Sequence, residues 1–413
     1  MYNRKQERGQ ALIVLALAIV GLAGIVGLVV DGGNAFADRR SAQNAADSAA
    51  LAAAVIRIRG DQNFVDAAMA SASKNGYDNN GATNTVQVHS PPISGPNQGN
   101  IEYIQVVIVS HVQTYFARVV GVQQITNTVE ATSRSKLPEI TEILNGAAVI
   151  SLAPTSECEK EHKRSFWVHG EATLDITGGG VFVNSNNPTC AFMSFGSGSI
   201  RIRDDNQIMV VGGASIQKPH LLTPGVTVGA SQIPYPPPFF MPKVGCGNKI
   251  AQVSEDGTRM SDGAWDDEFP PPGVTDLESG VYCLNDGFVV TGGTLRGNNV
   301  TFVVEQGEVR FAGSADIQIN APNNGNNAGL LIYVPIENNS KVVLNGGTEA
   351  VFKGTILAPG SRIIINGNSS TTGFHSQIIG YTVEADGNSN VVIIYNDEQN
   401  YDALTMPEVQ FSE

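Results

Sequence analysis

Charged side chains are scarce in this chain of 413 residues, since only 15% are Asp, Glu, Lys or Arg. Soluble domains usually carry about a quarter. Acidic residues dominate, which gives a formal net charge of −14 at pH 7, and the one basic cluster lies at the N-terminus. A chain without a basic face lacks the charge pattern that binds nucleic acid. We therefore expect no nucleic-acid partner.

Catalytic and cofactor motifs are also missing. No HExxH, GxSxG, Walker or GxGxxG motif occurs in the context that its chemistry requires. The six histidines are scattered, and none of the four cysteines shows the spacing of metal ligands. We expect a protein that is not an enzyme, with no catalytic residue, no cofactor and no metal.

Two acidic stretches are the remaining candidates for chemistry. Asp204 and Asp205 are adjacent, and neighbours on one strand point to opposite faces, so they form an acid–base pair only if the chain bends there. The loop 261–268 holds several carboxylates that suit Ca²⁺, but their spacing differs from that of an EF-hand. A solvated acidic surface is the simpler interpretation of both.

One long apolar run organises the whole chain. Residues 11–30 carry no charge, and they follow the basic residues Arg4, Lys5 and Arg8. A helix of about twenty residues spans roughly 30 Å, which is the thickness of the hydrocarbon core of a bilayer. Positive charge before the run predicts an N-terminus in the cytoplasm. We therefore predict a single-pass anchor, with most of the chain extracytoplasmic.

Two other interpretations of this run stay open. Ala35, Phe36 and Ala37 have the small-x-small form of a signal-peptide cleavage site, although the apolar core of a signal is usually about 7–15 residues long. A buried core helix is the second alternative, although such helices seldom lack charge over this length.

The N-terminal stretch combines several short motifs around the apolar run. They are Arg8-Gly9-Gln10-Ala11-Leu12, Val30-Asp31-Gly32-Gly33, Asp38-Arg39-Arg40 and Gln43-Asn44-Ala45-Ala46-Asp47-Ser48-Ala49-Ala50-Leu51-Ala52. Together they resemble the N-terminal segment of TadE/TadG-like proteins, membrane-anchored components of the Tad (Flp, tight-adherence) pilus machinery of bacteria. The resemblance implies a place in the bacterial cytoplasmic membrane, beside pilus-assembly proteins or pilin helices.

The same resemblance points to a candidate processing site between Gly9 and Gln10. Pilins cleaved by prepilin peptidase carry Glu five residues after the cut, and this chain has Val14 there. We therefore expect the segment to stay attached as an anchor.

The first third of the chain alternates helical and β patterns. The alanine-rich run that ends near Ile58 continues the first helix, because alanine is the best helix former. A short helix over 61–74, β runs over 85–89, 101–111 and 125–133, and a helical turn over 114–120 follow. We predict residues 1–58 as basic cytoplasmic tip, transmembrane helix and helical continuation, and residues 59–136 as a small α+β domain of pilin-like order.

From residue 137 to residue 413, short apolar β runs alternate with Gly, Asn and Asp turns. Several runs recur at intervals near twenty residues, which is typical of three short strands per coil. We predict an all-β, right-handed parallel β-helix (solenoid), with a β-sandwich as the alternative. Prolines and aromatics gather in residues 218–286, which predicts a loop insertion because proline cannot donate to a ladder.

All four cysteines, Cys158, Cys190, Cys246 and Cys283, lie in this second part. An even number outside the cytoplasm indicates disulfides. We expect nearest neighbours to pair among the three possible connectivities, each stabilising by about 3–4 kcal/mol. Free buried thiols are the alternative.

These observations predict a structural component of a Tad/Flp-type pilus system, acting in adhesion or pilus capping and binding surface glycans or a host or abiotic surface. An anchored β-helix glycosidase or lyase acting on surface polysaccharide is the alternative, and two carboxylates within about 10 Å in a groove would favour it. An envelope scaffold unrelated to pili is a third hypothesis.

Overall fold

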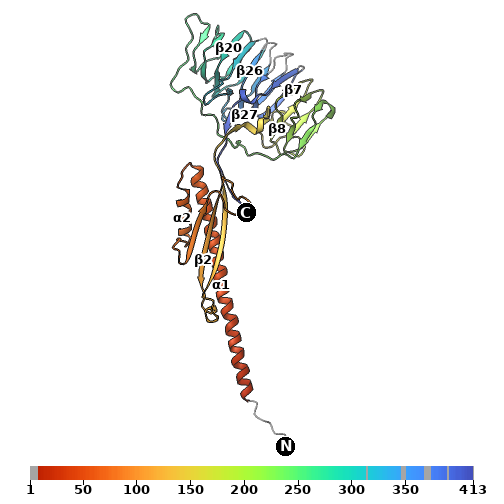
Figure 1. Cartoon of the computed structure of the whole chain (residues 1–413). Helices are drawn as coiled ribbons and strands as arrows, with labels where there is room; N and C mark the ends of the chain where they lie inside the picture. Colours follow the sequence, from red (N-terminus) through yellow and green to blue (C-terminus); the bar gives the residue numbers. More distant parts are fainter. Residues whose placement is uncertain (1–7, 313–314, 346–349, 367–373, 388–389, 413) are drawn as a thin grey trace. The chain divides into compact units, whose positions relative to one another are not determined.

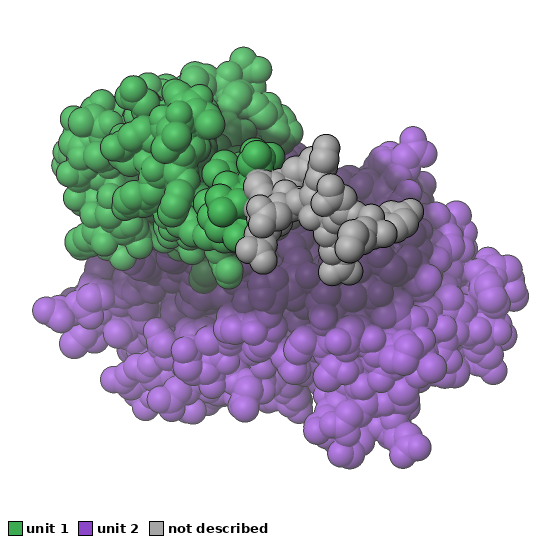
Figure 2. Space-filling model, turned by 90° about the horizontal axis from the view of Figure 1, so that it is seen from below, with its two compact units in different colours: residues 1–139, 406–413 green, residues 140–405 purple. Residues whose placement is uncertain are grey.

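The computed structural model describes residues 8–312, 315–345, 350–366, 374–387 and 390–412. The chain forms two compact units, residues 1–139 with 406–413 (unit 1) and residues 140–405 (unit 2) (Figure 2). The predicted basic tip with Arg4 and Lys5 lies outside the described residues.

A single helix, α1 (Arg8–Ile58), joins the apolar run to the alanine-rich run (Figure 1). The large apolar side chains from Leu12 to Val30 are between 39 and 76% exposed. Among the described residues this is the one helix long and apolar enough to cross a membrane. The predicted long N-terminal apolar helix is therefore confirmed.

The second half of α1 is packed inside unit 1. Alanines at helical spacing, among them Ala42, Ala46, Ala49 and Ala53, are fully buried. Their small side chains let α2 (Phe64–Lys74) and an antiparallel sheet approach the helix closely. The sheet contains, in spatial order, β1 (Asn84–His89), β2 (Tyr103–Gln113), β3 (Gln124–Lys136) and β32 (Glu408–Ser412).

The C-terminal strand β32 departs from the predicted domain boundary. It pairs antiparallel with β3, so residues 406–413 belong to unit 1 although the sequence placed them in the β-helix. Strand β4 (Ile140–Glu142) pairs with β31 (Asp402–Leu404), which brings the two ends of unit 2 together. Unit 2 is thus inserted between two neighbouring strands of the unit 1 sheet.

Unit 2 consists almost wholly of short parallel strands in three rows. The first row is a ten-stranded sheet in the order β13 (Leu222–Thr223), β10 (Ser199–Ile202), β7 (Thr173–Thr177), β30 (Asn390–Ile394), β28 (Phe374–His375), β26 (Val351–Lys353), β23 (Asp316–Asn320), β20 (Thr294–Asn298), β17 (Asp276–Leu277) and β15 (Arg259–Met260). In Figure 1, β7, β26 and β20 mark this row.

The other two rows belong to one sixteen-stranded sheet. The second row is β14 (Val226–Val228), β11 (Ile208–Val210), β8 (Val181–Val183), β5 (Val149–Ser151), β29 (Ile378–Asp386), β27 (Thr355–Asn366), β24 (Leu330–Tyr333), β21 (Val300–Val304), β18 (Gly280–Leu284) and β16 (Gly263–Trp265). The third row is β12 (Ala214–Ile216), β9 (Phe192–Ser194), β6 (Phe166–Val168), β25 (Val342–Asn345), β22 (Val309–Phe311) and β19 (Phe288–Val290), with β29 and β27 bridging its halves.

The pairing inside these rows is parallel, which confirms the predicted parallel β structure. Gly280 pairs with Val300 and Ile200 with Leu222, so neighbours in a row are about one predicted period apart in sequence. Parallel rows contradict the alternative of an antiparallel β-sandwich.

The chain enters the rows at their middle. From β5, β6 and β7 it runs to one end at β13 and β14, resumes at the other end with β15 and β16, and returns. Strands β29 and β30 then pair with β5, β6 and β7. We call this junction of the first and last strands the seam.

Residues 218–286 are not a continuous loop insertion. Strands β13 to β18 lie within this range and pair in parallel with the rows. The longest strand-free stretch of this range, residues 229–258, holds only isolated bridges, and it carries the chain from one end of the rows to the other. Prolines such as Pro236 and Pro238 lie there, as expected of residues that cannot donate to a ladder.

Phenylalanines stack inside unit 2. The ring centroids are 4.5 Å apart for Phe288 and Phe302, 5.0 Å for Phe311 and Phe352, and 5.2 Å for Phe352 and Phe374. All five rings are buried. Parallel neighbours place like side chains above one another, so the rows share one continuous core.

Candidate functional site

Asp31, the first charged residue after the apolar run, lies where α1 meets the loop between β2 and β3. Its side chain is buried, and its carboxylate accepts hydrogen bonds from the backbone N–H groups of Tyr115 (2.8 Å), Phe116 (2.9 Å) and Ala117 (2.7 Å). A turn of 3₁₀ helix (Ala117–Val120) begins there. The carboxylate therefore satisfies donors that a helix start would leave without partners.

Asp38 follows two helical turns later on the same face of α1. Its carboxylate accepts hydrogen bonds from the Asn127 amide of β3 (2.7 Å), the Tyr77 hydroxyl (3.1 Å) and the Ser110 hydroxyl of β2. Burial, and then the neighbouring Asp38, raise the pKa of Tyr77, which keeps this hydroxyl a donor. Asp31 and Asp38 together fix the sheet of unit 1 to the helix.

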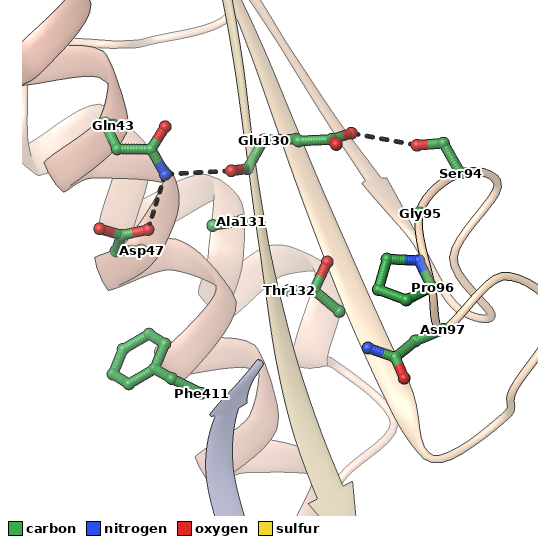
Figure 3. Close-up of a pocket in the computed structure, with 10 residues that line it drawn as sticks. All are labelled: Gln43, Asp47, Ser94, Gly95, Pro96, Asn97, Glu130, Ala131, Thr132 and Phe411. Carbon is green, nitrogen blue, oxygen red and sulfur yellow. Dashed lines mark hydrogen bonds between the residues drawn. The ribbon is translucent and has the colours of Figure 1, made fainter. Parts of the chain in front are cut away.

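A cavity of about 480 Å³ opens beside α1 one turn further on (Figure 3). The Gln43 amide donates to the Asp47 carboxylate (2.9 Å) and to the backbone oxygen of Glu130 in β3 (3.0 Å). Ser94, from the loop between β1 and β2, donates to the Glu130 side chain (3.0 Å). The remaining lining residues are Gly95, Pro96, Asn97, Ala131, Thr132 and Phe411. The groove is lined by polar and apolar groups in similar measure, which suits a peptide segment better than a small apolar ligand.

The four cysteines form two disulfides in unit 2. Cys158 is joined to Cys190 and Cys246 to Cys283, with Cα–Cα distances of 5.6 and 5.9 Å. Each bond joins nearest neighbours among the four cysteines in the sequence. The second bond ties the strand-free segment 229–258 to β18.

The seam holds a polar cluster. His169, directly after β6, lies 2.8 Å from a Glu384 oxygen and 3.3 Å from an Asp386 oxygen, both in β29. Arg362 of β27 pairs with the other Glu384 oxygen, and Trp167 stacks on the imidazole at 3.7 Å. Among the described residues, His169, Glu384 and Asp386 are the one group of His, Cys, Asp or Glu side chains close enough to share an ion. Because Arg362 already pairs with Glu384, we interpret the cluster as a polar network across the seam.

The two acidic stretches singled out in the sequence do not assemble a recognisable site. Asp204 and Asp205 lie in a left-handed turn after β10 (φ 62° and 59°), and Asp204 accepts from the N–H of Gly178 at 3.2 Å. Residues 261–268, predicted as a loop, include strand β16; there Asp262 pairs with Lys249, and Asp266 accepts a hydrogen bond from Asn285 at 2.6 Å. Asp204, Asp262 and Asp266 thus bind neighbouring groups of the protein.

Gly9 and Gln10 lie in the first turn of α1, and their role as a processing site stays a prediction. Sequence reasoning missed the roles of Asp31 and Asp38. Their spacing of two turns, which puts both carboxylates on one face, was the available signal. No local pattern connects His169 with Glu384, since they are 215 residues apart.

Comparison with known proteins identifies the N-terminal stretch. Residues 9–55 match the family model described as putative Flp pilus-assembly TadE/G-like. No curated protein and no solved structure matches the chain. The match confirms the predicted N-terminal resemblance and supports a component of the Tad pilus-assembly system. It spans both halves of α1, including Asp31, Asp38, Gln43 and Asp47.

Proposed function

We propose that the chain is a structural, membrane-anchored component of a Tad-type pilus assembly system. It lies in the bacterial cytoplasmic membrane with its N-terminus inside, and unit 2 and the part of unit 1 that follows the apolar run lie outside. The observation that carries this proposal is α1 itself, one helix whose first half is exposed and apolar and whose second half is packed in unit 1.

The exposed half of α1 needs a lipid environment. Apolar surface in contact with water costs about 25 cal/mol per Å², and thirteen large apolar side chains of this run are exposed, from Leu12 to Val30. The helix continues without interruption into the packed half. Movement of the anchor is therefore transmitted directly to unit 1.

Two independent features support the orientation. Arg4, Lys5 and Arg8 precede the apolar run, as expected of a cytoplasmic end. Unit 2 carries two disulfides, which persist in oxidising compartments and are rare in the cytoplasm.

Unit 2 would then be an ectodomain in the form of a right-handed parallel β-helix. Three rows of parallel strands one period apart support the coil, and connections between parallel strands are right-handed in nearly all proteins. Its work in this proposal is binding, in adhesion or pilus capping, with surface glycans or a host or abiotic surface as partner. The low charge content of the chain is compatible with this role.

The anchor can be tested with paired variants. Leu22→Arg with Val26→Arg places two charges in the apolar run, at about 2.5–3.5 kcal/mol each, whereas Leu22→Ala with Val26→Ala does not. We expect alkaline carbonate to extract the Arg variant from membranes and to leave the wild type and the Ala variant. Wild-type protein that is released with the cytosol would contradict the anchor.

Orientation and partners need separate measurements. Protease added outside spheroplasts should digest unit 2 and leave a membrane-bound N-terminal fragment. Photo-crosslinkers at Gln43 or Asp47 in the groove should capture pilus-assembly proteins or pilin helices, and the same crosslinker at the exposed Glu171 of unit 2 serves as the control. Equal capture from both positions would remove the support for a pilus role.

A further inference from the structure

The loop between β2 and β3, residues 114–123, presents an apolar surface. Val119 and Val120 are 88 and 80% exposed. The loop contains one charged residue, Arg118, and no acidic residue. Exposed apolar groups that gather on one loop indicate an interaction site. This surface, which we call the apolar tip, consists of Tyr115, Phe116, Val119, Val120 and Val122.

The apolar tip lies at the level of the apolar run of α1. A Cβ atom on Gly27 would come within 2.5 Å of the Phe116 Cβ, so the Phe116 side chain packs directly on the helix backbone at Gly27. Gly27 lies three residues inside the end of the uncharged run at Val30, which corresponds to about 4.5 Å along the helix. A membrane that covers residues 11–30 therefore reaches this loop.

Several backbone N–H groups of the loop have hydrogen-bond partners within the protein, as an apolar environment requires. Asp31 accepts from three successive N–H groups, those of Tyr115, Phe116 and Ala117. The N–H groups of Val119 and Val122 donate to loop carbonyls at 3.0 and 3.1 Å. Backbone groups that enter lipid need internal partners, because no water is present to replace them.

We propose that the apolar tip inserts into the bilayer beside α1, in the leaflet at the C-terminal end of the span. This inference rests on the proposed membrane anchor. Val119 and Val120 enter the acyl chains, while Tyr115 and Arg118 lie among the headgroups, where aromatic rings and long basic side chains are favoured. Lipid is the occupant because the tip is continuous with the apolar surface of α1 and at the same depth.

The second membrane contact gives unit 1 a defined orientation. A single helix can tilt and rotate in the bilayer, and neighbouring contacts and interfacial anchors set its angle. A loop fixed to the helix through Asp31 and Gly27 supplies such an anchor. The groove at Gln43 and Asp47 would then face a fixed direction relative to the membrane plane.

The test uses three single-cysteine variants of the full chain, Val119→Cys, Ile101→Cys and Leu22→Cys, with the native cysteines left in their disulfides. Each is labelled with an NBD fluorophore and reconstituted into phosphatidylcholine vesicles. Ile101 is the matched control, because it is 70% exposed and lies before the opposite end of the eleven-residue strand β2. Nitroxide-labelled lipid and aqueous iodide serve as quenchers.

We expect a blue-shifted emission at position 119 that is quenched by the labelled lipid and protected from iodide, and the reverse at position 101. If the labelled lipid quenches the probe at position 22 while iodide quenches the probe at position 119, the proposed insertion of the loop is wrong and the proposed membrane anchor is retained. Position 119 shielded from both quenchers indicates a protein partner and also overturns the proposal. If position 22 is not quenched by lipid, the anchor itself fails.

Discussion

The carboxylate of Asp38 accepts a hydrogen bond from the Asn127 amide at 2.7 Å, across 89 residues of sequence. Hydroxyl groups of Tyr77 and Ser110 donate to the same carboxylate. One side chain of α1 thus holds β2, β3 and the segment after α2. The three donor side chains are buried, so removal of the Asp38 carboxylate would leave them without a hydrogen-bond partner and would destabilise the folded state.

Replacement of this acceptor should loosen unit 1. We expect Asp38→Ala to destabilise unit 1 by about 2–4 kcal/mol, because unpaired buried donors cost about 1–3 kcal/mol each and the effects overlap. Hydrogen exchange of the β2 and β3 amides, followed by mass spectrometry, measures this change. Asp66→Ala on the exposed side of α2 is the control, and equal exchange in both variants would refute the role of Asp38.

Gly27 and Gly24 offer a matched pair for the loop contact. Gly27→Ala forces the Phe116 side chain to move, whereas a Cβ on Gly24 meets nothing within 4 Å. We expect Gly27→Ala to speed hydrogen exchange of the backbone N–H groups that donate to Asp31, those of residues 115–117. Gly24→Ala should leave their exchange rates unchanged. A similar response to both substitutions would show that helix propensity, and not the contact, matters.

The Cys246–Cys283 bond should control the strand-free segment. Its closed loop spans 37 residues, for which the chain-entropy relation gives about 4 kcal/mol. The double variant Cys246→Ser with Cys283→Ser should open residues 229–258 to limited proteolysis. The pair Cys158→Ser with Cys190→Ser is the control, because that bond lies outside the segment. Cleavage at 229–258 in the control alone would contradict this prediction.

Glu384 is the centre of the seam network. Its side chain is 10% exposed and binds both His169 and Arg362. Glu384→Ala leaves His169 and Arg362 without this acceptor. We therefore expect the free energy of unfolding of unit 2 to fall by about 2–3 kcal/mol. Chemical denaturation of the full chain in detergent measures it, with the exposed Glu171→Ala as reference. Equal free energies of unfolding for the Glu384→Ala and Glu171→Ala variants would show that apolar packing alone stabilises the seam.

The strand pair β4–β31 should depend on pH. Burial, followed by the charges of Asp397 and Asp402, raises the pKa of Glu142. Burial and then Asp397 also raise the pKa of Asp402. A carboxyl group with a raised pKa in the folded state stabilises that state while protonated, and the contribution is lost as the pH rises through the folded pKa. Amide protection of β4 and β31 should therefore be higher in mild acid than at neutral pH.

Glu142→Gln tests this pH dependence directly. It should raise the protection of β4 at neutral pH and flatten the pH profile, because one of the mutually repelling charges is gone. Glu398→Gln, an exposed neighbour, is the control. A profile that keeps its slope in the Glu142 variant would rule out these carboxylates as its cause.

Much of the architecture follows from local patterns. The uncharged run 11–30 and the buried alanines that follow predict one long helix, since both depend only on hydrophobicity and helix propensity. The short apolar strands near a period of twenty predict parallel pairing, as Gly280 with Val300 shows.

The pairings between residues far apart in the sequence could not be predicted from local patterns. Val149 pairs with Ile378, and Ser135 with Val409, yet no local spacing distinguishes these partners from residues of other strands. Which strand closes the seam depends on which edges remain free after the other strands have paired. The same limit applies to Asp38 with Asn127 and to His169 with Glu384, because polar partners far apart in sequence meet only through the complete fold.

The place of insertion of unit 2 has a consequence for evolution and engineering. Its first and last strands, β4 and β31, lie side by side, and the chain leaves and re-enters unit 1 through the neighbouring strands β3 and β32. Domains with adjacent ends are exchanged most readily, because the host keeps its own core. Residues 140–405 thus form a unit that we expect to be replaceable, and a foreign domain with closely spaced ends should be accepted between β3 and β32 in the same way.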